Sequence, residues 1–256
     1  VAKGDILFFI DADIKIKKNA LTLINKIFNK NPDINVIQGV YSHKPVYKNI
    51  TTQYQQSFFC YYTWGLCNKY VSTLTTCCFA IRRETFLKSG GFNTKIKAAT
   101  VEDEELGYKI IAQGNRILIS KGLKVDHMVD YKFSKFLKRN LAMYIDTMKS
   151  HLRNTTYVDK MRQKNYSRVL VGIALLGLII LSFGAMLLYP NILLILLFLT
   201  LNIFFVYLHF GFWKFVRSSK GLKMANGALL LMYIDTFLML IGTSFAIISF
   251  AFGRRY

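Results

Sequence analysis

The most informative part of the sequence is Ile6-Leu7-Phe8-Phe9-Ile10-Asp11-Ala12-Asp13. Its first five residues are apolar, and a short run with β-branched and aromatic members predicts a buried strand. Two aspartates follow, one residue apart, so that both carboxylates can turn toward one cation. Carboxylate oxygens suit Mg²⁺ or Mn²⁺, and Mg²⁺ is usually bound together with substrate phosphates. The stretch predicts a site for a diphosphate-bearing substrate, although the two aspartates taken alone are more typical of a turn after a strand.

Strand and helix signals alternate from this stretch to about residue 130, which indicates an α/β sheet domain. The expected strands are 5–10, 34–39, 77–81, 116–120 and 123–125. The expected helices are 19–29, 48–70, 84–88 and 103–113, and Gly114 has the position of a helix C-cap.

The carboxyl-terminal part of the chain is too apolar for an ordinary soluble domain. Hydrophobic residues make up 53% of the 256 residues, and the mean hydropathy is +0.29. Val169–Leu188 and Ile192–Phe212 carry no charge, and each is long enough to cross a bilayer as a helix. Tyr189-Pro190-Asn191 separates them with a helix breaker. These features predict a transmembrane hairpin.

A third apolar stretch, Gly227–Gly253, is interrupted by Asp235 and leaves two interpretations open. In the first, it spans the membrane and the carboxylate has a function there. In the second, Leu222–Asp235 lies in the membrane interface, and Thr236–Phe252 enters the bilayer without crossing it. Arg254 and Arg255 would lie outside in the first case and inside in the second.

The net charge of +20 is explained by the membrane. Two basic clusters flank the same side of the hairpin: Lys160, Arg162, Lys164 and Arg168 before it, and Lys214, Arg217, Lys220 and Lys223 after it. The positive-inside rule then places the sheet domain in the cytosol, facing anionic lipids of the cell membrane. Since no nucleic-acid-binding motif is present, we expect no nucleic acid partner.

A basic amphipathic stretch, 132–152, connects the two parts. Its apolar residues recur at helical spacing among lysines and Arg139, which favours a helix on the membrane surface over a core-facing helix. The predicted division is therefore a sheet domain over 1–130, an interfacial helix with a basic linker over 131–166, and a membrane region over 167–256.

Other polar residues are candidates for chemistry. Four consecutive acids, Glu102 to Glu105, open a predicted helix, where acids also complement the helix dipole. The turn Gly90-Gly91-Phe92 can approach a ligand closely. His127 follows an apolar strand and can complete a metal site, whereas His43, His151 and His209 lack such a context. The cysteines, without zinc-site spacing, are expected to be packed thiols: Cys60, Cys67, Cys77 and Cys78.

In this order, the residues resemble the membrane-associated family 2 glycosyltransferases, which have the GT-A fold. The resemblance covers roughly residues 1–150. It is carried by Ala2–Asp13, Phe79–Glu84, Gly90–Phe92, Glu102–Lys109 and His127. The opening strand of that family and its base-binding Asp are missing. We therefore expect a partial GT-A, Rossmann-like domain, and a nucleotide-base-binding portion that lies upstream of this chain.

The resemblance implies roles for single residues. Asp11, Asp13 and His127 would hold Mg²⁺ or Mn²⁺ on the diphosphate of a nucleotide sugar, and Asp103 would be the general base. Substrate contacts would come from Asp11, Gly90, Gly91, Phe92, Glu102 and Arg139. The implied reaction is inverting transfer of a sugar to a glycan, lipid or lipid-linked acceptor.

Two alternatives to this function are a polyprenyl-phosphate sugar synthase and a truncated, non-catalytic membrane subunit. The Glu-Asp pair favours a hydroxyl acceptor, which needs a base more than an anionic phosphate does. Processive relatives carry Gln-x-x-Arg-Trp on the interfacial helix. The corresponding Asn140–Tyr144 lacks the Arg and the Trp, so transfer of a single sugar is predicted.

Overall fold

The computed structural model describes residues 2–65, 69–71, 73–75, 77–96, 100–155 and 164–255, without the side chains of residues 164–166. Cys67, Lys160, Arg162 and the side chain of Lys164, all named in the sequence predictions, lie outside the described residues. The chain forms two compact units. The sheet unit comprises Val1–Lys132, Lys149–Met161 and Arg255–Tyr256, and the helical unit comprises Phe133–Met148 and Arg162–Arg254.

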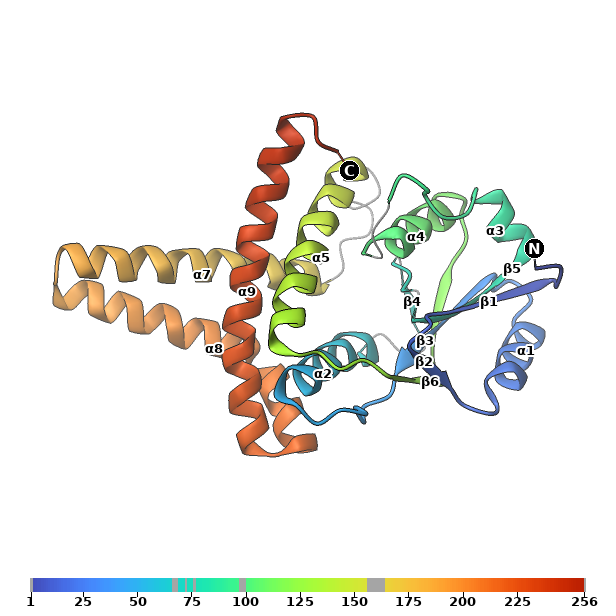
Figure 1. The fold of residues 1–256 in the computed structure, drawn as a ribbon, viewed down its shortest axis with the longest axis horizontal. Helices are drawn as coiled ribbons and strands as arrows, with labels where there is room; N and C mark the ends of the chain where they lie inside the picture. The colour runs from blue at the N-terminus through green and yellow to red at the C-terminus, as the bar shows by residue number, and fades with distance from the viewer. Residues whose placement is uncertain are drawn as a thin grey trace. The chain divides into compact units, whose positions relative to one another are not determined.

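A six-stranded mixed sheet forms the centre of the sheet unit (Figure 1). Its strands are β1 (Ile6–Ile10), β2 (Ile14–Ile16), β3 (Val36–Tyr41), β4 (Tyr70–Val71), β5 (Cys78–Arg82) and β6 (Ile117–His127). Their order is β1-β5-β3-β6-β2, and β4 also pairs with β6. β5 is antiparallel to both β1 and β3, and β3 is parallel to β6. Consequently β1, β3 and β6 run in the same direction and end at the same edge of the sheet.

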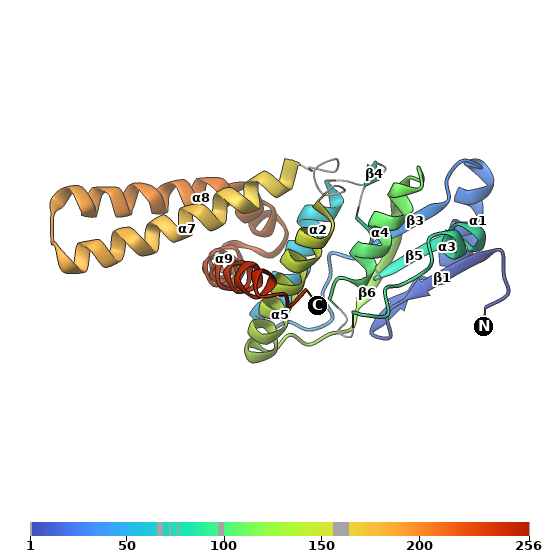
Figure 2. The ribbon, with the colours of Figure 1, turned by 90° about the horizontal axis from the view of Figure 1, so that it is seen from above.

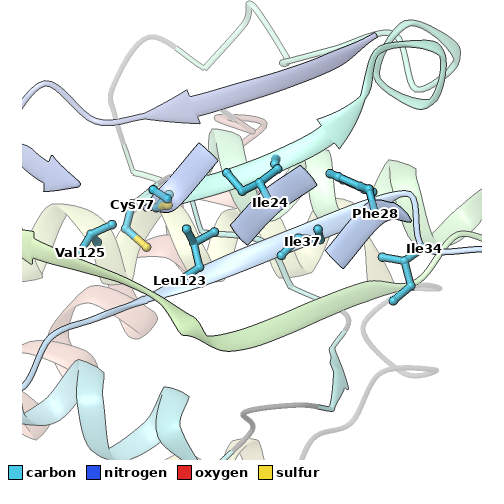
Figure 3. Packing of buried hydrophobic residues seen from close by; sticks show 10 residues of the cluster. Ile24, Phe28, Ile34, Ile37, Cys77, Leu123 and Val125 are labelled. Carbon is cyan, nitrogen blue, oxygen red and sulfur yellow. The ribbon is translucent and has the colours of Figure 1, made fainter. Parts of the chain in front are cut away.

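Both faces of the sheet are covered. The helices of this unit are α1 (Ala20–Lys30), α2 (Ile50–Trp64), α3 (Arg83–Lys88) and α4 (Glu102–Ala112). On one face, Ile24 and Phe28 of α1 pack in a cluster with Ile37 (Figure 3). On the other, Leu106 and Ile110 of α4 pack with strand residues. β5 serves both clusters, because successive strand side chains point to opposite faces.

Three details correct the predicted elements. The expected strands 116–120 and 123–125 are one strand, β6, whose pairing with β3 shifts register between Gln38 and Val40. The shift lies beside Gly39, where an added Cβ would come within 2.6 Å of the Leu123 carbonyl oxygen. The expected helix 48–70 ends at Trp64. β2 and β4 were not predicted, because strands of three and two residues give no readable periodicity.

The helical unit contains most of α5 (Phe133–Arg153) together with α7 (Lys164–Leu188), α8 (Ile192–Lys220) and α9 (Leu222–Ala251). The last three are long and apolar enough to cross a membrane. In the turn between α7 and α8, the Asn191 side chain accepts a hydrogen bond from the Leu193 N–H group at 2.8 Å. α9 continues without a break through Asp235. The predicted fold class, an α/β sheet domain followed by an amphipathic helix and carboxyl-terminal apolar helices, is confirmed.

Candidate active site

The candidate site lies where β1, β3 and β6 end together. Asp11 directly follows β1, and His127 is the last residue of β6. In open α/β sheets, ligands bind outside the carboxyl ends of the strands, so this edge is the expected position of a substrate. The Ile14 N–H group donates to the Asp11 carbonyl oxygen at 3.1 Å, and this turn leads the chain into β2.

The register of β2 brings the second aspartate to His127. Ile14 lies opposite His127 in the antiparallel β2–β6 pair, and the Met128 N–H group donates to the Asp13 carbonyl oxygen at 2.8 Å. The Asp13 Oδ2 atom is then 3.6 Å from the His127 Nε2 atom. The imidazole is buried, whereas the Asp13 side chain is 46% exposed. The carboxylate is therefore open to solvent and to a ligand.

Aromatic rings fix the His127 imidazole. It stacks on the Tyr41 ring at a centroid distance of 4.8 Å and meets the Tyr131 ring edge-on at 5.7 Å. Tyr41 is itself held by α2, since the Trp64 indole N–H group donates to the Tyr41 carbonyl oxygen at 3.2 Å. A ring held on two sides keeps its nitrogen aimed at Asp13.

Asp126, the neighbour of His127, holds the ends of three strands together. Its carboxylate accepts hydrogen bonds from Lys17 Nζ at 2.6 Å and from Ser42 Oγ at 2.5 Å. Burial acts to raise the pKa of Asp126, but these two hydrogen bonds outweigh it and hold the pKa below its ordinary value. The carboxylate is ionised at neutral pH and serves as a structural anchor beside the site.

The charges of Asp11 and Asp103 both contribute to the raised pKa of the Cys77 thiol. Burial raises the pKa of Cys77 to about 12, and the negative charges of Asp11 and Asp103 contribute to the increase against a hydrogen bond from Thr75. The charges of both carboxylates therefore reach Cys77, although burial is the main cause of the raised pKa. Ile10 lies opposite Cys78 in the antiparallel β1–β5 pair. Asp11 is the residue after Ile10 and Cys77 is the residue before Cys78, so the same register brings Asp11 to Cys77. The predicted metal ligand and the predicted base are thus brought to one region.

The other acids of the α4 amino terminus have structural partners. Glu104 accepts a hydrogen bond from the Tyr108 hydroxyl at 2.5 Å and lies 3.1 Å from His151 Nε2. Glu105, which is buried, accepts from Asn93 Nδ2 at 2.8 Å and from Arg153 Nε at 3.0 Å. These contacts attach the start of α4 to the last turn of α5. His151, for which the sequence analysis found no partner or role, therefore contacts Glu104 in the folded chain.

We expect Arg153→Met to destabilise the sheet unit by about 3–5 kcal/mol, because the substitution leaves the buried Glu105 carboxylate without its charged partner. Thermal unfolding in detergent micelles measures the effect. Lys88→Met is the matched control, since it removes an ion pair to Glu84 that is largely exposed and should change the unfolding temperature little. Equal unfolding temperatures for the two variants would contradict the structural role of Arg153.

Glu102 differs from Glu104 and Glu105, which have structural partners. The Glu102 Oε2 atom is buried and has no hydrogen-bond partner among the described residues. Asp103 Oδ1 accepts a hydrogen bond from the Glu104 N–H group at 2.7 Å. A buried acceptor without a partner is uncommon and calls for an explanation. A hydroxyl group of a bound substrate would supply the missing donor.

The remaining predicted substrate contacts are placed as follows. Gly90 and Gly91 have left-handed backbones, with φ of 73° and 64°, and the Gly91 carbonyl oxygen accepts from Lys109 Nζ at 2.9 Å. Phe92 packs inside the sheet unit, with its ring 5.6 Å from that of Phe9. Arg139 lies on α5 in the helical unit. Their contacts with substrate stay predictions.

A divalent ion fits this site if the substrate supplies the remaining ligands of the ion. Asp13 and His127 present an oxygen and a nitrogen 3.6 Å apart, within the span of two ligands that each lie roughly 2.1 Å from an ion. Across the described part of the chain, no group of three or more His, Cys, Asp and Glu side chains is arranged to hold a metal. Mg²⁺ commonly takes one or two carboxylates and completes its shell with substrate phosphates and water.

The three cysteines that the structure describes are not proposed to take part in this chemistry. Cys60, Cys77 and Cys78 are buried free thiols, as the sequence predicts. Burial also raises the pKa of Cys78, which keeps its thiol protonated and unreactive at neutral pH.

Comparison with known proteins gives a family match for the amino-terminal part. Residues 1–90 match the sequence model of glycosyl transferase family 2. This part of the chain is therefore similar to that family. The family 2 portion includes β1, β2, Asp11 and Asp13, while Asp103 and His127 lie beyond the matched residues. The family predicted from the sequence is confirmed over this range.

The other comparisons add less. Comparison with curated proteins gives no match. A solved structure similar to this chain is the mannosyltransferase PcManGT from Pyrobaculum calidifontis, in complex with GDP-Man and Mn²⁺, with a TM-score of 0.47 and 14% sequence identity. The similarity covers 94% of this chain and 63% of the mannosyltransferase chain. The chain therefore spans less than two thirds of that protein.

Proposed function

We propose that the protein is an inverting glycosyltransferase. It moves a single sugar from a nucleotide-diphosphate sugar to an acceptor hydroxyl at the cytosolic face of the cell membrane, and it depends on Mg²⁺ or Mn²⁺. The observation that carries the proposal is the joint position of Asp11, Asp13, Asp103 and His127. The first two belong to the family 2 portion, Asp13 lies beside His127, and Asp11 and Asp103 act on one thiol.

Asp11, Asp13 and His127 bind the donor side of the reaction. Their carboxylates and imidazole would hold a divalent ion against the diphosphate. When bound, such an ion offsets the charge that develops on the leaving nucleoside diphosphate. Tyr41 and Tyr131 keep the imidazole oriented toward Asp13, so the site is formed before the substrate arrives.

Asp103 and Glu102 act on the acceptor side. The Asp103 carboxylate takes the proton of the acceptor hydroxyl as its oxygen forms a bond to the anomeric carbon. The bond from that carbon to the diphosphate oxygen breaks, and the nucleoside diphosphate leaves with the electron pair. Attack from the face opposite the leaving group inverts the anomeric configuration in one step. The buried Glu102 Oε2 atom accepts a hydrogen bond from a substrate hydroxyl.

The reaction is proposed to take place at the membrane surface. The acceptor is a glycan, a lipid or a lipid-linked sugar, and anionic lipids face the basic residues beside the hairpin. The interfacial helix and linker over 131–166 connect the catalytic domain over 1–130 to the membrane region over 167–256. Gly90, Gly91, Phe92 and Arg139 are proposed as further substrate contacts.

Turnover of nucleotide sugars by the protein in its own membrane tests the proposal. The membranes are incubated with Mn²⁺ and, separately, with UDP-glucose, UDP-N-acetylglucosamine and GDP-mannose, and the nucleoside diphosphate and the anomeric configuration of the product are followed. We expect acceptor-dependent release with one donor, loss of release with EDTA, and an inverted product. A product of retained configuration, or no turnover above that of membranes without the protein, would contradict it.

A further inference from the structure

Both ends of α5 are attached to the sheet unit. Just before the helix, the Tyr131 N–H group donates to Thr52 Oγ1 at 2.8 Å, and at its other end Arg153 pairs with Glu105. The helix has 21 residues, which at 1.5 Å per residue gives about 31 Å, enough to cross a bilayer. Because its two ends contact one folded unit, α5 cannot place them on opposite sides of a membrane.

α9 packs along α5 within the helical unit. Asn140 Nδ2 and the Tyr144 hydroxyl of α5 both donate to Asp235 Oδ1 of α9, each at 2.8 Å. One face of α9 also approaches α5 closely at Gly242, where an added Cβ would lie 3.0 Å from the Cβ of Tyr144. Figures 1 and 2 show α9 alongside α5 and across the α7–α8 hairpin. Contacts advance in the same direction along both helices, so the two run parallel.

The end of α9 returns to the sheet unit. α9 ends at Ala251, and four residues later the Arg255 carbonyl oxygen accepts a hydrogen bond from Arg153 NH1. Arg255 belongs to the sheet unit, unlike the residues before it. The same guanidinium therefore contacts α4 through Glu105 and the chain that follows α9.

We propose that α9 lies in the membrane interface on the side of the sheet unit and does not cross the bilayer. The inference takes α7 and α8 as the two crossings, which return the chain at Lys220 to the side on which α7 began. α9 starts directly after Gly221 and is held against α5, and Arg255, four residues beyond the last residue of α9, contacts Arg153. A crossing would carry Arg255 about 30 Å away, to the opposite face.

The outer face of α9 fits the lipid boundary. Six exposed apolar residues recur every three, four or seven positions and form one stripe: Leu230, Phe237, Ile241, Phe245, Ile248 and Phe252. Asp235 is buried on the packed side, against Asn140 and Tyr144. This stripe can face acyl chains while the opposite side of α9 packs on protein.

Charge supports the same placement. In the interfacial arrangement, Arg254 and Arg255 lie on the same side as the basic residues at the end of α8, Lys214, Arg217 and Lys220. The positive-inside rule favours that side for all of them. If α9 crossed the bilayer, Arg254 and Arg255 would lie on the outer side, contrary to this rule.

Cysteine labelling of the whole protein in sealed membrane vesicles tests the topology. Three exposed positions are used: Leu21→Cys in α1, Tyr189→Cys between α7 and α8, and Arg254→Cys after α9. A membrane-impermeant maleimide is applied before and after detergent, with the parent protein as background. We expect Arg254→Cys to label from the same face as Leu21→Cys, and Tyr189→Cys from the opposite face. Labelling of Arg254→Cys together with Tyr189→Cys would overturn the proposal.

Depth within the bilayer gives a second, independent measurement. Bimane is attached to Leu230→Cys, Ile241→Cys and Phe252→Cys, and quenching by lipids brominated at known depths is compared. An interfacial α9 gives the same shallow depth at all three positions. A crossing helix gives a deep Ile241→Cys between two shallow positions, and that pattern would overturn the proposal even where the cysteine at residue 254 labels poorly.

Discussion

Asp103→Asn is expected to lower the rate of sugar transfer by about 10²–10⁴-fold, the usual contribution of a general base. The amide has nearly the shape of the carboxylate, but it cannot take the acceptor proton. Because Asp103 is proposed to act on the acceptor, the dissociation constant of the donor with Mn²⁺ should stay close to that of the parent protein. Steady-state kinetics and donor titration by calorimetry measure the two quantities.

Asp33→Asn is the matched control for this change. Asp33 is exposed in the loop between α1 and β3, so the same carboxylate-to-amide substitution there should leave transfer unchanged. If Asp103→Asn transferred sugar at the parent rate, the base would be another group. Equal losses of rate and of donor affinity would instead place Asp103 on the donor side.

The second large effect is expected from Asp13→Ala, which removes the carboxylate that lies 3.6 Å from His127. Loss of a hydrogen-bonded partner of a metal ligand typically weakens metal affinity by about 10–100-fold, and loss of a ligand should cost at least as much. We expect metal-dependent donor binding to weaken by that factor or more, while the residual binding no longer responds to Mn²⁺. Donor titration with and without EDTA measures both.

Asp33→Ala provides the comparison for Asp13→Ala, since it also removes an exposed carboxylate from a loop next to a strand. Its donor affinity and Mn²⁺ dependence should equal those of the parent. Unchanged Mn²⁺ dependence in Asp13→Ala would contradict the metal site. It would support the other interpretation of the two aspartates, that they only form a turn after the strand.

The sequence was most informative where a local pattern has one physical interpretation. The uncharged runs that became α7 and α8 could be predicted, because twenty apolar residues fit no other structure well. The strand Ile6–Ile10 was predicted for a similar reason, since it is short, apolar and ends in turn-forming residues. The third apolar stretch allowed two interpretations, because its hydropathy does not reveal which side chains pack against protein.

The site itself was predicted only in part. Asp11, Asp13, Asp103 and His127 were named from their types and neighbours, but their distances depend on strand register. His151 and Arg153 were missed as partners of Glu104 and Glu105, since 47 and 48 residues separate each pair. A possible signal was the excess of acids at the start of α4, which calls for cations somewhere in the fold.

Local composition alone determined that this chain has a sheet domain, a basic amphipathic helix and long apolar helices. Together with the family resemblance, it also pointed to the residues that are proposed to carry the chemistry. Only the tertiary structure decided which of those residues meet. The β2–β6 pairing set Asp13 beside His127, and the contacts of Asp235 and Arg255 fixed α9 along α5. Such contacts join residues far apart in the chain, and no local pattern records them.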